Sequence, residues 1–273
     1  MEESSLRKPA VAGQFYPSSK TELKKILGEL TSPNLEKQDA IACVLPHAGY
    51  IYSGKVAGQT VSRINIKDKV ILLGPNHTGY GTEFSIMSAG AWRTPLGDIK
   101  IDSSLAKKIQ ERSSDLQDDA LAHMHEHSLE VELPFLQFFK PDFEIVPIAF
   151  ATGNIYALKQ IGRQIASVIL EEKLKSSCLI VASSDMTHYE PQEEAEKKDH
   201  EAIKAMLELN EDRLIEEIRK YNITMCGFAP VVCALAAAKD LGAKNAKLAL
   251  YQTSGDVSGD KSSVVGYAGI IIY

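Results

Sequence analysis

Residues 70–78 read Val-Ile-Leu-Leu-Gly-Pro-Asn-His-Thr, and the interpretation of the whole chain starts from this stretch. Four consecutive apolar residues, closed by Gly74 and Pro75, indicate a strand that is buried on both faces, as in a parallel sheet covered by helices. Proline cannot extend a central ladder and glycine tolerates a tight turn. The pattern therefore places His77 just beyond the carboxyl end of that strand.

The same layout occurs twice more in the chain. An apolar run at 40–45 leads into Pro-His-Ala-Gly, which contains His47, and a run at 178–182 leads into Ser-Ser-Asp-Met-Thr-His, which contains Asp185 and His188. Open α/β sheets hold their sites in the crevice beyond the carboxyl ends of the strands. We therefore expect the three histidine-bearing loops to converge on one site.

Helical and strand patterns alternate along the rest of the chain. Ser19 and Glu22 form a capping box before a helix, Asn154 can cap another, and helical spacing covers Ser103–Arg112. Further helices are expected at 54–64, 192–209, 212–221 and 230–241, and further strands at 84–88, 144–150, 247–252 and 264–273. This alternation predicts an α/β fold: a single domain over residues 1–273 with a largely parallel central sheet flanked by helices.

Three other segments have no clean period. Residues 5–17 carry turn formers and two aromatic residues, and we expect an ordered arm that lies across the domain. Residues 92–98 predict a turn. Residues 253–263 are rich in Ser, Gly and Asp, which is typical of a surface loop or a lid.

The composition limits the classes of partner that we expect for this protein. The chain has 273 residues and a formal net charge of −6, and its lysine-rich stretches lie beside carboxylates. Phosphate contacts need a basic face, so we expect no nucleic-acid partner. The first residues are polar, and no stretch approaches the roughly 20 apolar residues of a membrane span. We therefore expect a cytoplasmic protein with no membrane partner.

A dense histidine cluster follows the predicted helix at Ser103–Arg112. His123, His125 and His127 would share one face if the segment were extended, and such a cluster can bind metal by itself. The alternative is an ordinary polar loop before a helix, because acidic residues surround the cluster. We favour His127 as a functional residue, since it lies closest to the structured segment that begins at Leu129.

The third histidine-bearing loop has its own chemistry. Asp185 and His188 are three residues apart, and an aspartate that orients a neighbouring histidine is the usual arrangement for a general base. The alternative is that Asp185 only caps the turn that follows. His200 lies among charged residues of a predicted helix, and we expect it to be exposed.

The four cysteines form no CxxC pair. Cys43 and Cys178 lie inside apolar strands and are interpreted as core thiols. Cys226 directly precedes a predicted helix, whose N-terminus lowers a thiol pKa and makes a thiolate available as a ligand or nucleophile. The alternative for Cys226 is a buried thiol at the start of the helix.

Seven sequence blocks, in order, are shared with a known family. They are 7–17 (Arg-Lys-Pro-Ala-Val-Ala-Gly-Gln-Phe-Tyr-Pro), 46–50 (Pro-His-Ala-Gly-Tyr), 74–77 (Gly-Pro-Asn-His), 93–97 (Arg-Thr-Pro-Leu-Gly), 126–130 (Glu-His-Ser-Leu-Glu), 183–188 (Ser-Ser-Asp-Met-Thr-His) and 225–227 (Met-Cys-Gly). With these blocks the chain resembles the Memo family from residue 7 to its final strand.

The resemblance implies a fold and a ligand set. The Memo family is similar to the class III extradiol ring-cleaving dioxygenases, non-haem iron enzymes in which two histidines and one carboxylate bind Fe(II). It implies an extradiol-dioxygenase-like fold with His47, His77 and Cys226 as metal ligands, a cysteine standing where the carboxylate would be. Asp185 and His188 would line the same pocket. Two imidazoles and one thiolate suit copper, zinc or iron held for redox purposes.

Three functions follow as hypotheses. The first is a metal-dependent, redox-active protein in which His188 acts as acid or base, Asp185 orients it and His127 contributes to catalysis. The second is a non-enzymatic protein that captures a peptide or partner loop in the same cleft, and the third is a hydrolase with Cys226 as nucleophile. Tyrosines near the cleft loops would stack on a small aromatic ligand or on a peptide. The resemblance also implies a radical S-adenosylmethionine partner system, because prokaryotic members are often encoded near such proteins.

Overall fold

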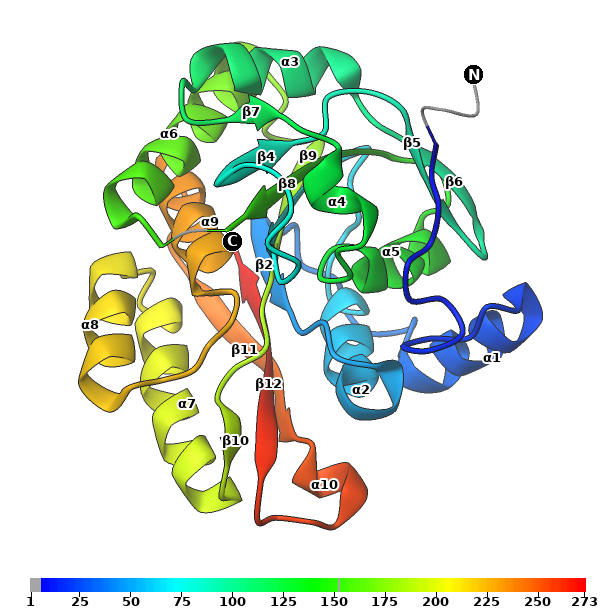
Figure 1. Ribbon diagram of the computed structural model, residues 1–273, viewed down its shortest axis with the longest axis vertical. Helices are drawn as coiled ribbons and strands as arrows, with labels where there is room; N and C mark the ends of the chain where they lie inside the picture. The colour runs from blue at the N-terminus through cyan, green and yellow to red at the C-terminus, as the bar shows by residue number, and fades with distance from the viewer. Residues whose placement is uncertain (1–5, 152) are drawn as a thin grey trace.

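The centre of the fold is a mixed sheet between two layers of helices (Figure 1). The computed structural model describes residues 6–151 and 153–273. Its strands are β1 (Leu6–Arg7), β2 (Ala42–Leu45), β3 (Lys69–Pro75), β4 (Phe84–Ile86), β5 (Ala91–Thr94), β6 (Gly97–Lys100), β7 (Gln117–Asp118), β8 (Glu144–Phe150), β9 (Cys178–Ser183), β10 (His188–Glu190), β11 (Ala246–Thr253) and β12 (Val264–Ile272). Its helices are α1 (Lys20–Leu30), α2 (Tyr50–Val61), α3 (Ser103–Arg112), α4 (Leu121–Met124), the 3₁₀ turn η2 (Glu130–Glu132), α5 (Leu133–Phe139), α6 (Ile155–Glu171), α7 (Gln192–Leu207), α8 (Glu211–Tyr221), α9 (Phe228–Asp240) and α10 (Gly255–Ser258).

The sheet order is β10-β12-β2-β9-β3-β8-β4-β7, with β11 paired to β12. The four central strands β2, β9, β3 and β8 are parallel, which confirms the predicted α/β fold with a largely parallel central sheet. Outside these four strands the pairing is mostly antiparallel: β12 pairs with β2 and β11 in that sense and β4 pairs with β8, whereas β7 pairs with β4 in the parallel sense. A short connection such as the one between β11 and β12 cannot join parallel neighbours, which need a long crossover.

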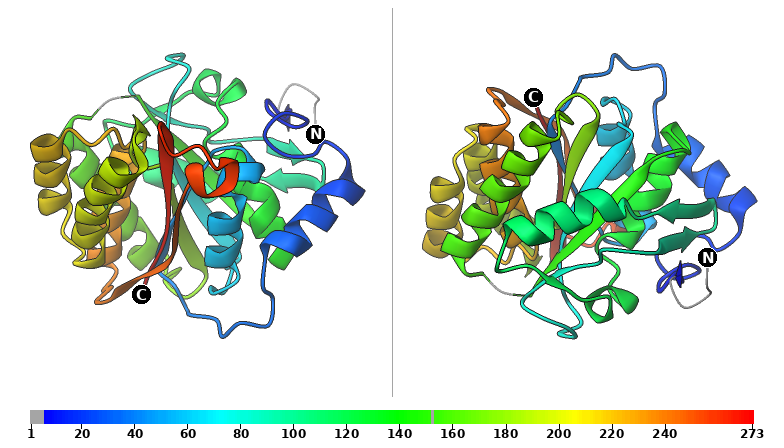
Figure 2. Two further views of the ribbon diagram at one scale, coloured as in Figure 1. Left: turned by 90° about the horizontal axis from the view of Figure 1, so that it is seen from below. Right: turned by 90° about the horizontal axis from the view of Figure 1, so that it is seen from above.

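Helices cover both faces of the sheet, as the two views in Figure 2 show. On one face α9 packs against β2, β9 and β3, and α6 and α8 pack on α9. On the other face α2 packs against β2, β11 and β12, with α1 and α5 beside it. The apolar residues of the central strands are buried from both sides, which is why their sequences show continuous apolar runs instead of alternation.

Local sequence signals set the helix starts. The Ser19 hydroxyl accepts from the backbone N–H of Glu22, and the Asn154 side chain accepts from the N–H of Ala157, as predicted for both caps. Helix α3 has the predicted bounds. Helix α2 begins at Tyr50, earlier than predicted, and its added first turn includes the buried Tyr50, whose hydroxyl donates to the Val131 carbonyl.

The three segments that show no regular hydrophobic period adopt three different structures. The predicted arm lies across the domain from residue 6 onward, while its first residue, Ser5, is outside the described residues. The predicted turn at 92–98 is the β5–β6 hairpin, which pairs with β1 in a separate three-stranded sheet. The predicted loop at 253–263 contains the short helix α10, at the bottom of Figure 1.

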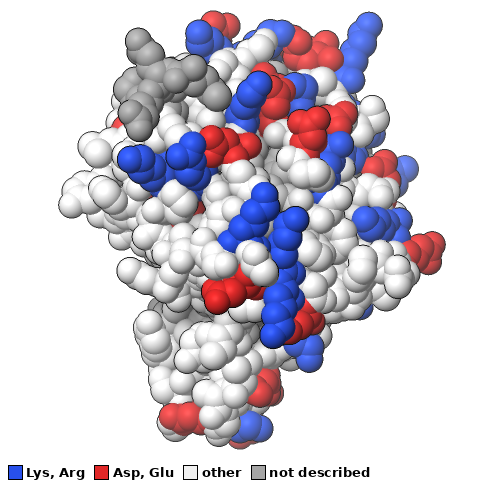
Figure 3. Space-filling view, turned by 90° about the vertical axis from the view of Figure 1, so that its right-hand side faces the viewer, with Lys and Arg blue, Asp and Glu red and all other residues white. Residues whose placement is uncertain are grey.

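Several remaining expectations are also settled by the fold. Cys43 and Cys178 are buried core thiols and His200 is exposed, all as predicted. Within residues 6–151 and 153–273, no helix is both long and apolar enough to cross a membrane. On the face shown in Figure 3, positive side chains lie beside negative ones across much of the charged surface.

Candidate metal centre

The three histidine-bearing loops meet at one edge of the sheet. Strands β2, β9 and β3 are adjacent and parallel, so their carboxyl ends lie at the same edge. His47, Asp185 and His77 each lie two residues beyond the ends of these strands. The predicted convergence of the loops therefore follows directly from the sheet order.

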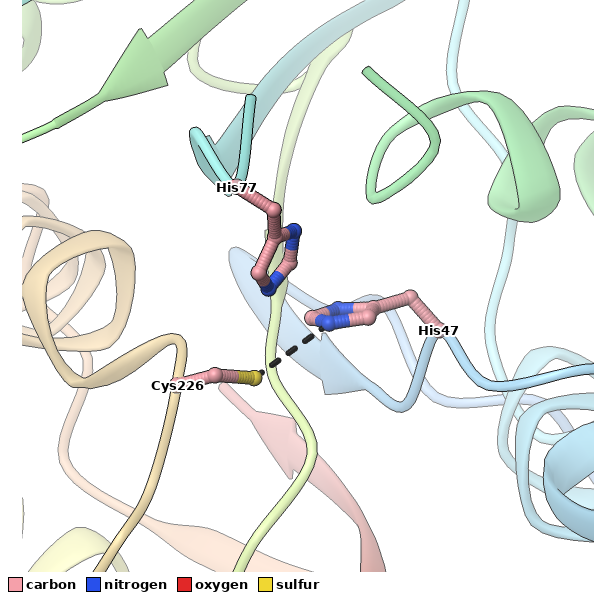
Figure 4. Close-up of side chains that lie close together, drawn as sticks. All are labelled: His47, His77 and Cys226. Atoms are coloured by element: carbon pink, nitrogen blue, oxygen red, sulfur yellow. Dashed lines mark hydrogen bonds between the residues drawn. The ribbon is translucent and has the colours of Figure 1, made fainter. Parts of the chain in front are cut away.

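Two imidazoles and one thiol point toward one another at this edge, as Figure 4 shows. Ligand atoms of His47, His77 and Cys226 all lie within 4.8 Å of one another. The Cys226 Sγ is 3.3 Å from the His47 Nε2, and the rings of His47 and His77 have centroids 5.2 Å apart. This group can hold a metal ion.

The ring of His77 is fixed by a buried carboxylate. The His77 Nδ1 lies 3.0 Å from the Glu126 Oε1, and the His77 backbone N–H donates to the other oxygen of Glu126. Burial alone would raise the pKa of Glu126, but the hydrogen bonds from His77 and the backbone outweigh it and lower the pKa to about 2. An ionised Glu126 accepts from Nδ1–H, which leaves the His77 Nε2 with a free lone pair for a ligand.

The ring of His47 is fixed by a hydroxyl. Its Nδ1 lies 2.8 Å from the Ser183 Oγ, and its backbone N–H donates to the Asp185 Oδ1 at 2.8 Å. Burial lowers the pKa of His47 well below its ordinary value, so the imidazole is neutral. A neutral ring that donates from Nδ1 presents the lone pair of Nε2 to Cys226.

These distances fit a metal ion between the three residues. Metal–nitrogen and metal–sulfur bonds of the lengths found for zinc imply an N···S separation of about 3.1 Å at a right angle and about 3.6 Å at a tetrahedral angle. The 3.3 Å between the His47 Nε2 and the Cys226 Sγ lies within that range. In addition, the Nδ1 of each imidazole is engaged by a neighbouring side chain, which is typical of histidine ligands in transition-metal sites.

The thiol of Cys226 is not activated in the way its position suggested. Burial and the nearby Asp185 raise its pKa, and they outweigh the backbone N–H groups that lower it. The prediction that the helix N-terminus lowers this pKa is therefore wrong for the metal-free protein. The Cys226 Sγ lies 3.3 Å from the His47 Nε2 and 3.8 Å from the Asp185 carbonyl oxygen, and a metal ion has to displace the thiol proton.

All six predicted site residues line one cavity of about 520 Å³, alongside Phe15, Ala48, Gly49, Tyr189, Thr224, Val265 and Tyr267. Asp185 does not orient His188, contrary to prediction. The Asp185 carboxylate instead accepts the His47 backbone N–H, and burial raises its pKa to about 7. The His188 Nδ1 lies 2.9 Å from the Thr224 carbonyl, which holds the ring in its place.

The three histidines of the 123–127 segment separate in the structure. His127 stacks on His77 with ring centroids 4.8 Å apart and lines the cavity, as favoured from the sequence. His123 is fully buried beside Trp92, and His125 is exposed near Tyr80. The segment is a short helix and turn and is not extended, so the condition under which the three rings would share one face is not met.

Sequence reasoning missed the residues that support the ligands. No role was predicted for Glu126 or Ser183, yet each holds one ligand imidazole. Phe15, on the arm, makes an edge contact with His127 at 4.9 Å between ring centroids. The available signal for Glu126 and Ser183 was that both residues lie in the shared blocks 126–130 and 183–188.

Together these features define an α/β protein with a two-imidazole, one-thiol centre at the carboxyl edge of its sheet. The chain belongs to the Memo family: the family described as Memo-like protein matches residues 7–271. The MEMO1 family protein of Aquifex aeolicus is 47% identical, covering 97% of this chain and 98% of that protein. The MEMO1 family protein MK0963 of Methanopyrus kandleri is 42% identical over 97% of this chain and 98% of its own length.

A solved structure shares the fold. The uncharacterized protein JW3007 from Escherichia coli K12 superposes with a TM-score of 0.55 and 12% sequence identity, covering 84% of this chain and 98% of that chain. At this identity the likeness concerns the arrangement of helices and strands alone.

Proposed function

We propose that this protein is metal-dependent and holds a copper, iron or zinc ion with His47, His77 and Cys226, and that it is redox-active when the ion is copper or iron. The observation that carries the proposal is the convergence of their three ligand atoms within 4.8 Å, with the outward nitrogen of each ring already engaged. Bound copper or iron would supply one-electron chemistry, and bound zinc would supply a Lewis acid. The related dioxygenases supply the precedent for the scaffold.

The chain's own residues would bind and orient a small ligand beside the ion. His188 donates from Nδ1 to the Thr224 carbonyl, so its Nε2 is free to take a proton from a ligand. Burial lowers the pKa of His188, which keeps the ring neutral at pH 7 and able to act as a base. Phe15 and Tyr267 supply aromatic surfaces on the cavity wall, which favours a ligand with a small aromatic ring.

Metal analysis of protein purified without chelator tests the proposal. Stoichiometric metal is expected in the wild type and in His125→Ala, whose exposed histidine lies outside the cavity. Both His47→Ala and Cys226→Ser should lose the metal, because each removes one of three ligands. Copper or zinc affinity retained within a few-fold in Cys226→Ser would move the third ligand to His127 or His188 and overturn the proposed set.

One substitution sharpens the choice of metal. Cys226→Glu replaces a soft thiolate by a hard carboxylate and recreates the two-histidine, one-carboxylate set of the ring-cleaving relatives. The preference should shift away from thiol-seeking ions toward Fe(II). Competition between zinc and Fe(II) under anaerobic conditions measures that shift.

The contact between Cys226 and His47 also fits a second function, a cysteine-nucleophile hydrolase. A thiol within 3.3 Å of an imidazole nitrogen has the base that a nucleophile needs. Metal-free protein whose Cys226 is alkylated rapidly, and more slowly in His47→Ala, would support this function over the metal centre. Slow alkylation that is further suppressed by added zinc would support the metal centre.

A further inference from the structure

The hydroxyl of Ser183 lies among three polar atoms behind the metal centre. Its Oγ is 2.7 Å from the Ser128 carbonyl oxygen, 2.9 Å from the Glu132 Oε1 and 2.8 Å from the His47 Nδ1. All four residues are buried. Solvent therefore supplies no proton to these contacts, and the residues themselves must supply all of them.

Counting protons decides which atom donates in each contact. Three short contacts need three protons, and Ser183 has only one. The Ser128 carbonyl accepts and never donates, so Ser183 donates there and accepts from its other two neighbours. The remaining protons must come from the His47 Nδ1–H and from a protonated Glu132. This arrangement uses the single O–H and both lone pairs of Ser183.

The surroundings of Glu132 favour the protonated form independently of that count. Glu132 is fully buried, and its Oε2 has no hydrogen-bond partner. Burial raises the pKa of Glu132 well above its ordinary value, and the negative field of Asp185 raises it further. An ionised Glu132 would leave a buried charge with a bare oxygen and would also place Ser183 and Ser128 in contact without a proton.

We propose that Glu132 is a protonated positioning residue that donates to Ser183 and so fixes the ring of His47 with Nδ1 protonated and Nε2 open toward Cys226. The Glu126 carboxylate fixes the ring of His77 in a corresponding way, but in its ionised form. The two carboxyl groups that hold the imidazole rings of the centre are therefore one ionised, Glu126, and one protonated, Glu132. The effect of Glu132 on metal affinity rests on the proposed metal function, whereas its protonation and the His47 tautomer do not.

Two measurements on the metal-free protein test the protonation. Infrared spectra of protein labelled with ¹³C-glutamate should show a protonated carboxylic acid band at pH 7, and this band should be absent from Glu132→Gln. Nitrogen chemical shifts of His47 should show a protonated Nδ1 and an unprotonated Nε2. A spectrum with carboxylate bands alone, or a His47 that is protonated on Nε2, would overturn the proposal even if the variant failed to fold.

A matched pair of variants tests the positioning. Glu132→Gln keeps an N–H donor, whereas Glu132→Met has a similar size and no donor. Zinc affinity should stay within a few-fold of wild type in Glu132→Gln, fall further in Glu132→Met, and fall about 10- to 100-fold in Ser183→Ala, the usual cost of losing a residue that supports a ligand. Equal zinc affinities in Glu132→Gln and Glu132→Met would overturn the positioning role. Wild-type protein that binds no zinc would refute the metal function and leave the infrared and nitrogen-shift results standing.

Discussion

Two buried polar clusters each include a glutamate of the segment 126–130: Glu126 supports the candidate metal centre, and Glu130 binds the N-terminal arm. The two clusters differ in where the lone pairs of their polar atoms point. Glu130 accepts from Arg7, from the Tyr16 hydroxyl at 2.6 Å and from the backbone N–H groups of residues 10 and 11. We call Arg7, Tyr16 and Glu130 the arm anchor. All of these donors and acceptors are used up inside the protein.

The metal centre is built from the same kinds of groups but is left open. His47 and His77 are held through Nδ1, and their Nε2 atoms meet Cys226 at a common point. The comparison teaches that burial and hydrogen bonding do not by themselves distinguish a structural cluster from a binding one. What distinguishes the two clusters is the set of atoms brought together: the arm anchor pairs a cation with an anion, whereas the candidate centre gathers two imidazole nitrogens and a thiol within 4.8 Å.

Breaking the arm anchor should have the largest effect on stability. Glu130→Ala leaves the guanidinium of Arg7 buried without its counter-charge, and removal of one partner of a buried ion pair costs about 3–5 kcal/mol. Urea unfolding of the metal-free protein measures this change. Glu22→Ala, an exposed glutamate near the start of α1, is the control and should change little. A loss below about 1 kcal/mol in Glu130→Ala would mean that the arm is held by other contacts.

The next largest effect on stability should come from the buried His123. Burial lowers the pKa of His123 to about 4, so the unfolded chain takes up a proton below about pH 6.5 while the folded protein does not. The stability that the neutral ring provides is complete above that pH and is lost as the pH falls toward 4, by up to about 3 kcal/mol.

His123→Phe should therefore reduce the acid sensitivity of the protein. Urea midpoints recorded at pH 7, 5.5 and 4.5 should fall less steeply in this variant than in wild type. His125→Ala, which changes an exposed ring, should follow the wild-type slope. Parallel slopes for His123→Phe and wild type would show that other groups dominate acid unfolding.

A moderate effect is expected in the pH dependence of metal binding. Because burial and Asp185 raise the pKa of Cys226, the ion displaces a thiol proton throughout the neutral range. Zinc affinity should rise about tenfold per pH unit between about pH 6 and 8. Chelator competition measures it, with Cys226→Ser as the variant that should lose this slope. A flat wild-type profile would mean that the thiol does not ligate the ion.

The smallest effect should come from the contact between the two clusters. Phe15 directly precedes Tyr16 of the arm anchor and places its ring edge against His127. Phe15→Ala removes an aromatic pair worth about 1 kcal/mol and should change zinc affinity by only a few-fold, because no ligand is lost. Phe15→Leu, which keeps apolar bulk, should lie between the alanine variant and wild type. A zinc affinity that falls as far as in His47→Ala would make the arm part of the centre.

Local patterns predicted the individual elements well. Helix α3 and strand β8 have the bounds that periodicity and cap residues indicated, because neighbours in the sequence decide both. The antiparallel pairings outside the central strands and the pairing of β1 with β5 were not predicted, since they depend on which strands become neighbours in space. The early start of α2 was missed as well, since a tertiary contact in its first turn, such as that of Tyr50 with the Val131 carbonyl, leaves no sequence period.

The residues of the candidate site were likewise predicted only in part. Polar residues after buried strands pointed to His47 and His77, and the family resemblance added Cys226 to the set. Their supports, Glu126 and Ser183, could not be found in this way, because a buried polar residue is defined by partners far away in the chain. The pKa of Cys226 was predicted in the wrong direction because burial is a tertiary property.

The strand order also sets when the centre can come into existence during synthesis. Strands β2 and β3 are consecutive in this part of the chain, but β9, which begins at Cys178, is inserted between them. Cys226 is made later still. A nascent chain that has produced both histidines therefore lacks the strand that spaces them and also Cys226. The complete group of His47, His77 and Cys226 forms only once the sheet has folded, so the proposed metal function would begin only after synthesis has passed Cys226.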